Sequence, residues 1–149
     1  MQSILRQARR SDVHDIMRVR LSVNENQLTS RVISDDEVIE SIEVSGRGWV
    51  VEVDGRIVAF AIGNAQTGNI WALFVEPGHE GQGHGRRLQA EMIAWLWSQG
   101  LKRLWLSTSP GTRAERFYES TGWQRQGLTS DGEVLFEQRE NVRSPRSPT

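Results

Sequence analysis

Apolar residues recur along the chain at two spacings, one typical of helices and one of strands. Near the N-terminus, residues 3–8 predict a short strand. Apolar residues then follow at helical spacing behind Ser11, a residue type that caps helix N-termini. After a polar connection over residues 24–33, a capping-box pattern predicts a second helix over residues 34–45.

The middle of the chain is rich in strand-forming residues. Two such runs, 49–53 and 56–64, are joined by Asp54-Gly55, the strongest short signal for a hairpin. We therefore expect these runs to be antiparallel neighbours. A third run, over residues 69–75, is ended by a proline and a glycine.

The second half of the chain alternates between helix and strand patterns. A stripe of apolar residues predicts the longest helix, from Arg86 to a glycine cap at Gly100. After this helix, the pattern predicts a strand over residues 103–108 and a helix over residues 112–121. A hairpin follows, whose two strands are residues 123–128 and 134–138. We therefore expect one domain over residues 1–140, followed by a tail, 141–149, whose Ser, Pro and Arg content predicts disorder.

Composition limits the classes of function open to this chain. Its 149 residues, 37% hydrophobic content and net charge of -1 are typical of a globular domain and show no basic bias for nucleic acid. The absence of cysteine excludes a disulfide framework, a thiolate metal site and a cysteine nucleophile. The histidines lack metal-ligand spacing, so we expect no metal. With no secretion-signal pattern and no apolar run of about 18 residues, we expect a cytoplasmic protein without a membrane partner.

The most informative stretch runs from the third strand into the longest helix. Gly81, Gly83 and Gly85 leave backbone N–H groups open to an anion, and the helix that follows adds its positive end. This pattern predicts a phosphate-binding loop, and the alternative is a tight turn without a ligand. Arg86-Arg87 stands where a Walker A loop needs Lys-Ser or Lys-Thr, and glycines spaced by twos do not fit a dinucleotide fingerprint.

A second motif lies in the last predicted helix, where Ala114, Phe117, Tyr118, Gly122 and Trp123 follow one another at the spacing Ala-x-x-Phe-Tyr-x-x-x-Gly-Trp. Together with the glycine loop, this motif resembles the GNAT superfamily of N-acetyltransferases. The resemblance covers residues 3–138 and implies an α/β (α+β) fold. That fold has a central mixed, mostly antiparallel sheet of six to seven strands flanked by about four helices. The co-substrate implied is acetyl-CoA.

The resemblance implies a coenzyme site around the glycine loop. Its expected residues are Phe74, Val75, Gly81, Gln82, Gly83, His84, Gly85, Arg86, Thr112 and Arg113. Two departures from the family pattern matter. Glu80 stands where the family usually has Arg or Gln, so we expect mainly backbone contacts to the diphosphate. The Asn that often opens the second signature is absent, so Thr112 or Arg113 is expected to take its place.

The resemblance also implies a mechanism in which an amine attacks the thioester directly, which agrees with the absence of cysteine. The backbone N–H of Phe74 or Val75 is expected to stabilise the oxyanion. Tyr118 matches the general acid that protonates the departing thiolate, and the other interpretation of this residue is a core aromatic.

The acceptor side of the site is less marked in the sequence. The candidates for the general base are Glu25, Glu76, His79 and His84, each of which is otherwise a solvated loop residue. The residues expected to contact the acceptor are Arg20, Asn24, Glu25 and Trp71, whose alternatives are an exposed helix end or core packing.

The sequence therefore predicts an acetyl-CoA-dependent N-acetyltransferase that acts on a primary amine of a small molecule. Two alternatives stay open: a catalytically silent acyl-CoA-binding regulatory module, and an enzyme that modifies amines of proteins or peptides. Tyr118 argues against the silent module. A homodimer also stays open, because no interface is marked in the sequence.

Overall fold

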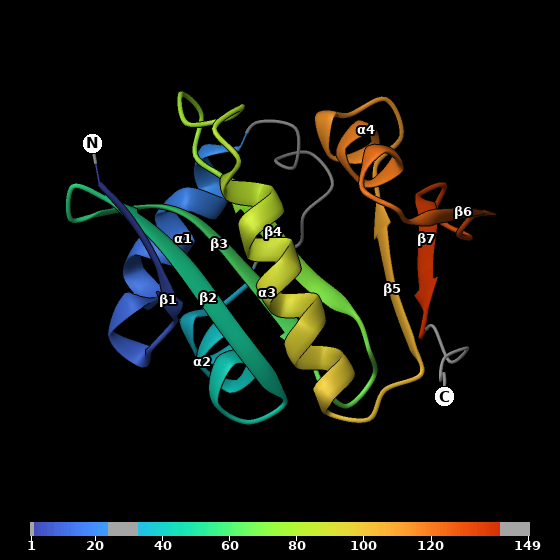
Figure 1. Ribbon diagram of the computed structural model, residues 1–149, viewed down its shortest axis with the longest axis horizontal. Coiled ribbons are helices and arrows are strands. Elements are labelled where there is room, and N and C mark those ends of the chain that lie inside the picture. Colours follow the sequence, from blue (N-terminus) through green and yellow to red (C-terminus); the bar gives the residue numbers. More distant parts are fainter. Residues whose placement is uncertain (1, 24–32, 141–149) are drawn as a thin grey trace, which may run out of the picture.

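The computed structural model describes residues 2–23 and 33–140 (Figure 1). Within these ranges, strands and helices follow one another along the chain. Their bounds, in order, are β1 (Ser3–Gln7), the short 3-10 helix η1 (Arg10–Asp12), α1 (Val13–Ser22), α2 (Asp35–Glu43), β2 (Gly46–Val53), β3 (Arg56–Asn64), β4 (Ile70–Val75), α3 (His84–Ser98), β5 (Arg103–Thr108), α4 (Arg113–Ser120), β6 (Gln124–Leu128) and β7 (Val134–Arg139).

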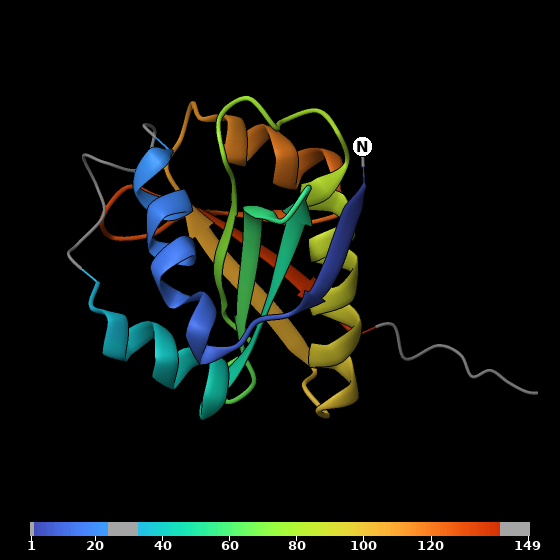
Figure 2. The ribbon, with the colours of Figure 1, turned by 90° about the vertical axis from the view of Figure 1, so that its left-hand side faces the viewer.

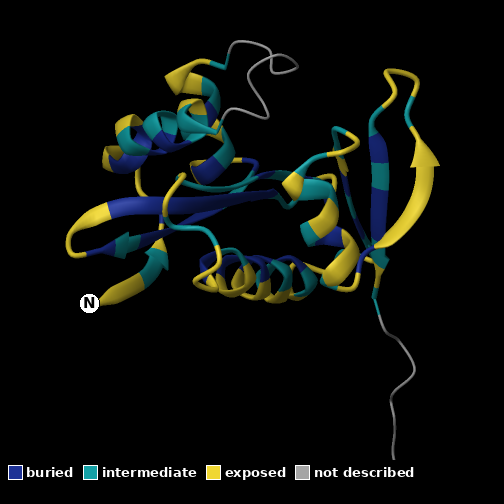
Figure 3. Ribbon diagram, turned by 90° about the horizontal axis from the view of Figure 1, so that it is seen from above, coloured by how far each residue is buried: buried dark blue, intermediate teal, exposed yellow. Residues whose placement is uncertain are grey.

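The first sheet forms the centre of the molecule. Its strands are all antiparallel, in the order β1-β2-β3-β4. Helices α1 and α2 cover one face and α3 covers the other (Figures 1 and 2). The inner strands are consequently buried on both faces, as Figure 3 shows. One apolar cluster lies under α3 and a second lies under α1 and α2.

The second sheet has the order β5-β7-β6 and is also antiparallel. In the described part of the chain, the two sheets are linked by one parallel bridge, between Asn69 and Trp105. There the N–H of Trp105 donates to the carbonyl of Gly68 at 3.0 Å. The expected number of strands and the mostly antiparallel pairing are confirmed, and the mixed character of the sheet comes from this single bridge. Beyond it β4 and β5 do not pair, which leaves one edge of β4 open.

Local signals in the sequence explain several of these elements. The capping box of α2 is confirmed, because the N–H of Glu37 donates to Ser34 Oγ at 3.2 Å and the N–H of Ser34 donates to Glu37 Oε1 at 3.1 Å. The hairpin between β2 and β3 is also confirmed. Asp54 and Gly55 have φ values of 51° and 81°, and positive φ at both positions is typical of the tightest hairpin turns.

The start of α1 differs from the sequence prediction. Ser11 is not its N-cap, because the turn η1 comes first and places Asp12 in that position. The carboxylate of Asp12 is buried, accepts a hydrogen bond of 2.8 Å from the N–H of Arg9 and pairs with Arg6 at 2.8 Å. Asp12 therefore closes the turn, and its bonds keep its pKa below the ordinary value, with the Arg6 bond as the largest cause.

Two glycines move element boundaries away from the expected positions. β2 begins at Gly46 rather than at Trp49. At Gly46 the backbone passes so close to β3 that a Cβ would lie 1.9 Å from the carbonyl oxygen of Gly63, so only a glycine allows the strand to pair there. α3 begins at His84 rather than at Arg86, because Gly83 takes the N-cap position with φ at 86°. Over the described ranges, no helix is both long and apolar enough to cross a membrane.

Candidate functional site

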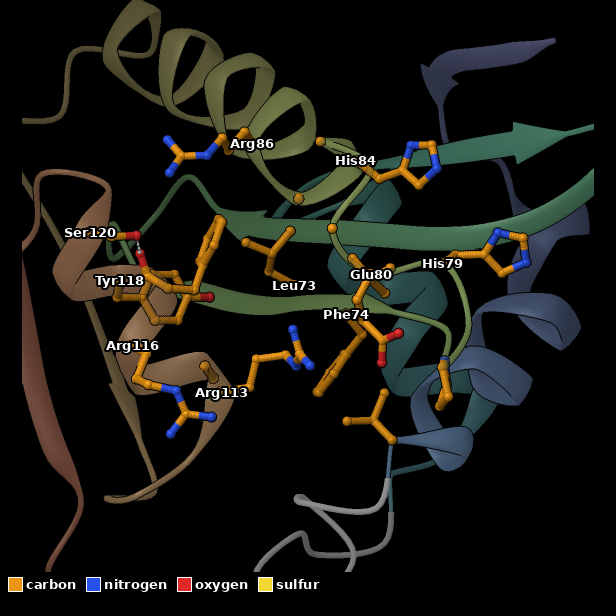
Figure 4. Close-up of a pocket in the computed structure, with 18 residues that line it drawn as sticks. Leu73, Phe74, His79, Glu80, His84, Arg86, Arg113, Arg116, Tyr118 and Ser120 are labelled. Carbon is orange, nitrogen blue, oxygen red and sulfur yellow. Dashed lines mark hydrogen bonds between the residues drawn. The ribbon is translucent and has the colours of Figure 1, made fainter. Parts of the chain in front are cut away.

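A cavity of about 940 Å³ opens where β4 ends (Figure 4). Its walls are the end of β4, the glycine loop, the first turn of α3, the inner face of α4 and Val23. Most of the site residues predicted from sequence line this cavity, namely Phe74, Val75, Gly81, Gly83, His84, Gly85, Arg86, Arg113 and Tyr118. The two sequence motifs, about 30 residues apart in the chain, therefore face one shared space.

Other predicted residues lie elsewhere. Gln82 and Thr112 do not line the cavity; the amide oxygen of Gln82 lies 3.1 Å from His84 Nε2, and the Thr112 hydroxyl caps α4 by accepting from the N–H of Glu115 at 3.2 Å. Arg20 on α1 and Trp71 on β4 are also outside the lining. The remaining two acceptor-site predictions, Asn24 and Glu25, lie outside the described residues, as does the tail predicted to be disordered.

The glycine loop has the geometry of an anion site. Gly81 and Gly83 have φ values of 75° and 86°, a backbone conformation that glycine adopts without strain. Gly83 is the N-cap of α3 and offers no side chain to the first-turn amides. These N–H groups and the positive end of the helix are therefore available to a phosphate in the cavity.

Glu80 turns toward the loop rather than away from the cavity. Its Oε1 accepts a hydrogen bond of 2.9 Å from the N–H of Gly78, and Glu80 itself is part of the lining. The bond from Gly78, together with one from its own N–H, lowers the pKa of Glu80, so this carboxylate is ionised at neutral pH. The sequence left the direction of this side chain open.

Arginines supply positive charge around the same cavity. Arg86 from α3 and Arg113 and Arg116 from α4 all line it. In Figure 4 the side chain of Arg113 extends from α4 toward Phe74. A ligand with several phosphate charges would therefore meet cations from both helices, although the loop itself carries an acid.

Tyr118 is the most buried polar side chain in the α4 wall, with 6% of its surface exposed. Its ring packs against the rings of Phe117, Trp123 and Phe136, with centroids 5.2, 5.9 and 6.0 Å away. Within residues 2–23 and 33–140, its hydroxyl has no hydrogen-bond partner. Burial raises the pKa of Tyr118 above its ordinary value, so the hydroxyl is protonated at neutral pH. Tyr118 is thus both a core aromatic and a cavity residue.

The open edge of β4 determines which backbone amides reach the cavity. The N–H of Glu76 donates to the carbonyl of Val58 on β3 at 2.7 Å. N–H groups along an antiparallel strand alternate between facing the partner and facing away. Phe74 therefore directs its N–H to β3, whereas Val75 and Leu73 direct theirs to the open edge. Of the two predicted oxyanion donors, Val75 has the suitable orientation.

The candidate bases differ in their surroundings. Glu76 is held between Arg56 at 2.6 Å and Arg18 at 2.8 Å, and the Arg56 bond is the main cause of a lowered pKa. A carboxylate stabilised in this way is a weak base. His79 and His84 line the cavity, but their rings lie on the far side of the loop from Tyr118 (Figure 4).

A second, smaller cavity lies apart from the first. It has a volume of about 350 Å³ and brings Trp71 beside carboxylates of α2, among them Asp36 and Glu40. Within residues 2–23 and 33–140, no group of three or more His, Cys, Asp or Glu residues is arranged to hold a metal ion.

Some cavity residues were missed from the sequence. Alternation along β4 would have indicated Leu73, once the pairing of β4 was known. Arg116 follows Arg113 by three residues on α4, a spacing that places both on one face of the helix. Ser120 carries no such signal. Its position in the wall depends on how α4 is oriented against the two sheets.

Comparison with known proteins gives a consistent assignment. A model of the Acetyltransferase (GNAT) family matches residues 6–123. A search of curated protein sequences finds no match. Among solved structures, paiA N-acetyltransferase from Thermoplasma acidophilum, in complex with coenzyme A, superposes with a TM-score of 0.82 at 12% identity, covering 94% of this chain and 100% of its own.

Two further structures have the same fold. The ribosomal-protein-S18-alanine N-acetyltransferase from Escherichia coli superposes with a TM-score of 0.76 at 18% identity, covering 99% of this chain and 100% of its own. The Salmonella typhimurium protein yncA, solved with its cofactor acetyl-CoA, superposes with a TM-score of 0.75 at 17% identity, covering 98% of this chain and 99% of its own. With a family model that spans both sequence motifs and most of the described residues, the chain belongs to the acetyltransferase (GNAT) family.

Proposed function

We propose that this protein is an acetyl-CoA-dependent N-acetyltransferase that moves the acetyl group to a primary amine of a small molecule by direct attack. The observation that carries the proposal is that one cavity joins the uncapped N-terminus of α3 to Tyr118, whose side chain is otherwise buried. One end suits phosphates, and the other end holds a proton donor. The coenzyme bound in paiA N-acetyltransferase and the acetyl-CoA bound in yncA support this choice of co-substrate.

The residues present fit coenzyme A. The N–H groups from Gly81 to Gly85 would hold the diphosphate, with Arg86 and Arg113 neutralising its charge. The open edge of β4 would receive the pantetheine arm, whose amides need backbone partners. This placement brings the thioester toward Tyr118.

The chain's own groups then carry the chemistry. The amine nitrogen forms a bond to the carbonyl carbon, and the N–H of Val75 at the open edge of β4 stabilises the negative oxygen. The carbon–sulfur bond breaks next, Tyr118 gives its proton to the departing thiolate, and the proton that the acylated nitrogen loses restores the Tyr118 hydroxyl. A thiol with a pKa of about 8.5 already leaves readily, so the contribution of Tyr118 is moderate.

The acceptor must lose a proton before it attacks, since an alkyl ammonium has a pKa near about 10.4. Glu76 is disfavoured as the base by its two arginines, which leaves His79, His84, Glu25 or a water chain. We place Arg20, Asn24, Glu25 and Trp71 on the acceptor side as part of this proposal. We also propose a single domain over residues 1–140 and a cytoplasmic location.

A thiol-release assay tests the proposal. Purified protein and acetyl-CoA are mixed with a panel of small primary amines and, separately, with peptides that carry a free N-terminus or lysine. The proposal expects thiol release that depends on a small amine. Release only with peptides would support the protein-modifying alternative. Tight coenzyme binding without release under any condition would support the silent regulatory module.

A further inference from the structure

Gln89 is a buried polar side chain on α3 that does not line the cavity. Its Oε1 accepts a hydrogen bond of 2.8 Å from Nε1 of Trp123, and this bond is buried. The hydroxyl of Thr121 lies 3.3 Å from the same oxygen, but its shorter contact is with the carbonyl of Phe117, at 2.9 Å. Gln89 therefore fastens α3 to the segment that directly follows α4.

Trp123 carries this connection to Tyr118. The indole is 5% exposed, and its ring meets the ring of Tyr118 at 78° with the centroids 5.9 Å apart. The backbone N–H of Trp123 also donates to the carbonyl of Tyr118 at 3.4 Å. A displacement of Trp123 would therefore move both the ring and the backbone of Tyr118.

The position of the Tyr118 hydroxyl depends on such packing. In the described part of the chain it makes no hydrogen bond that would orient it, so its place in the cavity is set by the rings around it. Gln89 lies four residues after Gly85, on the helix whose first turn forms the phosphate end of the cavity. One rigid helix thus positions the glycine loop and, through Gln89, the wall that carries Tyr118.

We infer that Gln89 is a positioning residue that acts through Trp123 to set the distance from the Tyr118 hydroxyl to the thioester sulfur. The inference rests on the proposed role of Tyr118 as the general acid. Gln89 would thus affect turnover although it lies outside the cavity. Its buried hydrogen bond to Trp123 connects the helix that follows the coenzyme loop to the wall that carries Tyr118.

Gln89→Leu tests the inference first. The variant leaves the Trp123 indole N–H buried without a partner, so the indole is expected to shift and to displace Tyr118. Misplacement of a catalytic group costs rate more than binding, and we expect kcat to fall about 10-fold with the KM for acetyl-CoA little changed. Gln126→Leu, at an exposed position on β6, is the matched control and should keep the kcat of the unmodified protein.

Removing both partners should restore the arrangement. In Gln89→Leu/Trp123→Phe, neither polar group is left buried and unpaired, and an aromatic ring still faces Tyr118. We therefore expect the double variant to recover most of the lost kcat. A double variant that is as slow as Gln89→Leu, or slower, would overturn the inference.

A double-mutant cycle that combines Gln89→Leu with Tyr118→Phe separates an effect on the position of Tyr118 from a general loss of stability. If Gln89 acts through the Tyr118 hydroxyl, Gln89→Leu has no further effect on kcat in the Tyr118→Phe background. An equal loss of kcat in both backgrounds, measured well below each melting temperature, would overturn the inference while the proposed function stands. If Tyr118→Phe alone leaves kcat unchanged, the acid role fails and the inference fails with it.

Discussion

The carboxylate of Glu80 accepts a hydrogen bond of 2.9 Å from the backbone N–H of Gly78, within the loop that lines the cavity. A negative charge is therefore fixed beside the backbone groups that suit a phosphate. The GNAT loop motif that this sequence resembles has Arg or Gln where Glu80 stands. In the proposed complex Glu80 weakens the hold on the diphosphate, and Arg86, Arg113 and Arg116 offset that effect from the helices.

Glu80→Gln should therefore tighten acetyl-CoA binding. The amide oxygen of Gln can still accept the Gly78 bond, so the variant removes the charge and keeps the loop. We expect the Kd for acetyl-CoA to fall about 3- to 10-fold, measured by titration calorimetry at low salt. Binding of S-acetylpantetheine, which is neutral, should not change.

Glu91→Gln, at an exposed position on α3, controls for the change in net charge and should leave both affinities unchanged. If Glu80→Gln binds acetyl-CoA more weakly than the unmodified protein, the carboxylate supports coenzyme binding, and the repulsion argument is wrong.

Gly83→Ala should weaken the coenzyme site directly. Gly83 has φ at 86°, and an added methyl group would meet nothing within 4 Å, so the cost is backbone strain of about 1 kcal/mol rather than a clash. Relief of that strain would turn the first amides of α3 away from the cavity. We expect a loss of acetyl-CoA affinity of about 10-fold or more by the same titration.

Gly132→Ala is the control for this strain. Gly132 has φ at 84° and equally open space around it, but it lies in the β6–β7 turn. The two variants should lose similar stability, while only Gly83→Ala should lose affinity. If Gly83→Ala and Gly132→Ala bind acetyl-CoA with equal affinity, the loop amides do not hold the coenzyme.

Tyr118→Phe should keep coenzyme binding and slow turnover. Phe retains the ring contacts with Trp123 and Phe136 and removes only the proton donor. We expect kcat to fall by about 100-fold at neutral pH, the lower end of what general acid catalysis contributes. Steady-state thiol release across pH checks this, and a kcat equal to that of the unmodified protein at every pH would remove Tyr118 from the acid role.

His84 should make stability depend on pH. Burial lowers its pKa below the ordinary 6.5, with smaller effects from the charges of Arg87 and His79. The unfolded chain therefore binds the proton more readily than the folded one, so stability is complete above about pH 6.5 and is lost as pH falls toward the folded pKa. Urea unfolding between about pH 5.5 and pH 8 should show this slope.

His84→Gln should flatten that slope, because the titrating ring is gone. His14→Gln, at an exposed position on α1, should retain it. A slope that is equally steep in His84→Gln would assign the dependence to other groups.

The features that could be predicted from the sequence have local signals. Asp54-Gly55 determines a hairpin within two residues, and Ser34 with Glu37 determines a helix start within four. The glycine loop and the motif around Tyr118 are also short enough to be found in the sequence alone. These signals indicated the order of elements, and most of the coenzyme-site residues that they predicted line the cavity.

The features that could not be predicted depend on partners far apart in the chain. Gln89 and Trp123 are 34 positions apart, and Arg18 and Glu76 are 58 positions apart. Nothing in either neighbourhood marks these pairs, because tertiary packing alone brings them together. The orientation of Glu80 was also open, since its bond to Gly78 depends on the detailed path of the loop.

The central claim is that the cavity binds acetyl-CoA, and thermal unfolding with and without acetyl-CoA tests it most directly. A ligand at about 100 times its Kd adds about 2.7 kcal/mol to the free energy of unfolding. We expect the melting temperature to rise with acetyl-CoA and to stay unchanged with ATP or NAD at the same concentration. No rise with saturating acetyl-CoA, or an equal rise with all three, would contradict the assignment of this site.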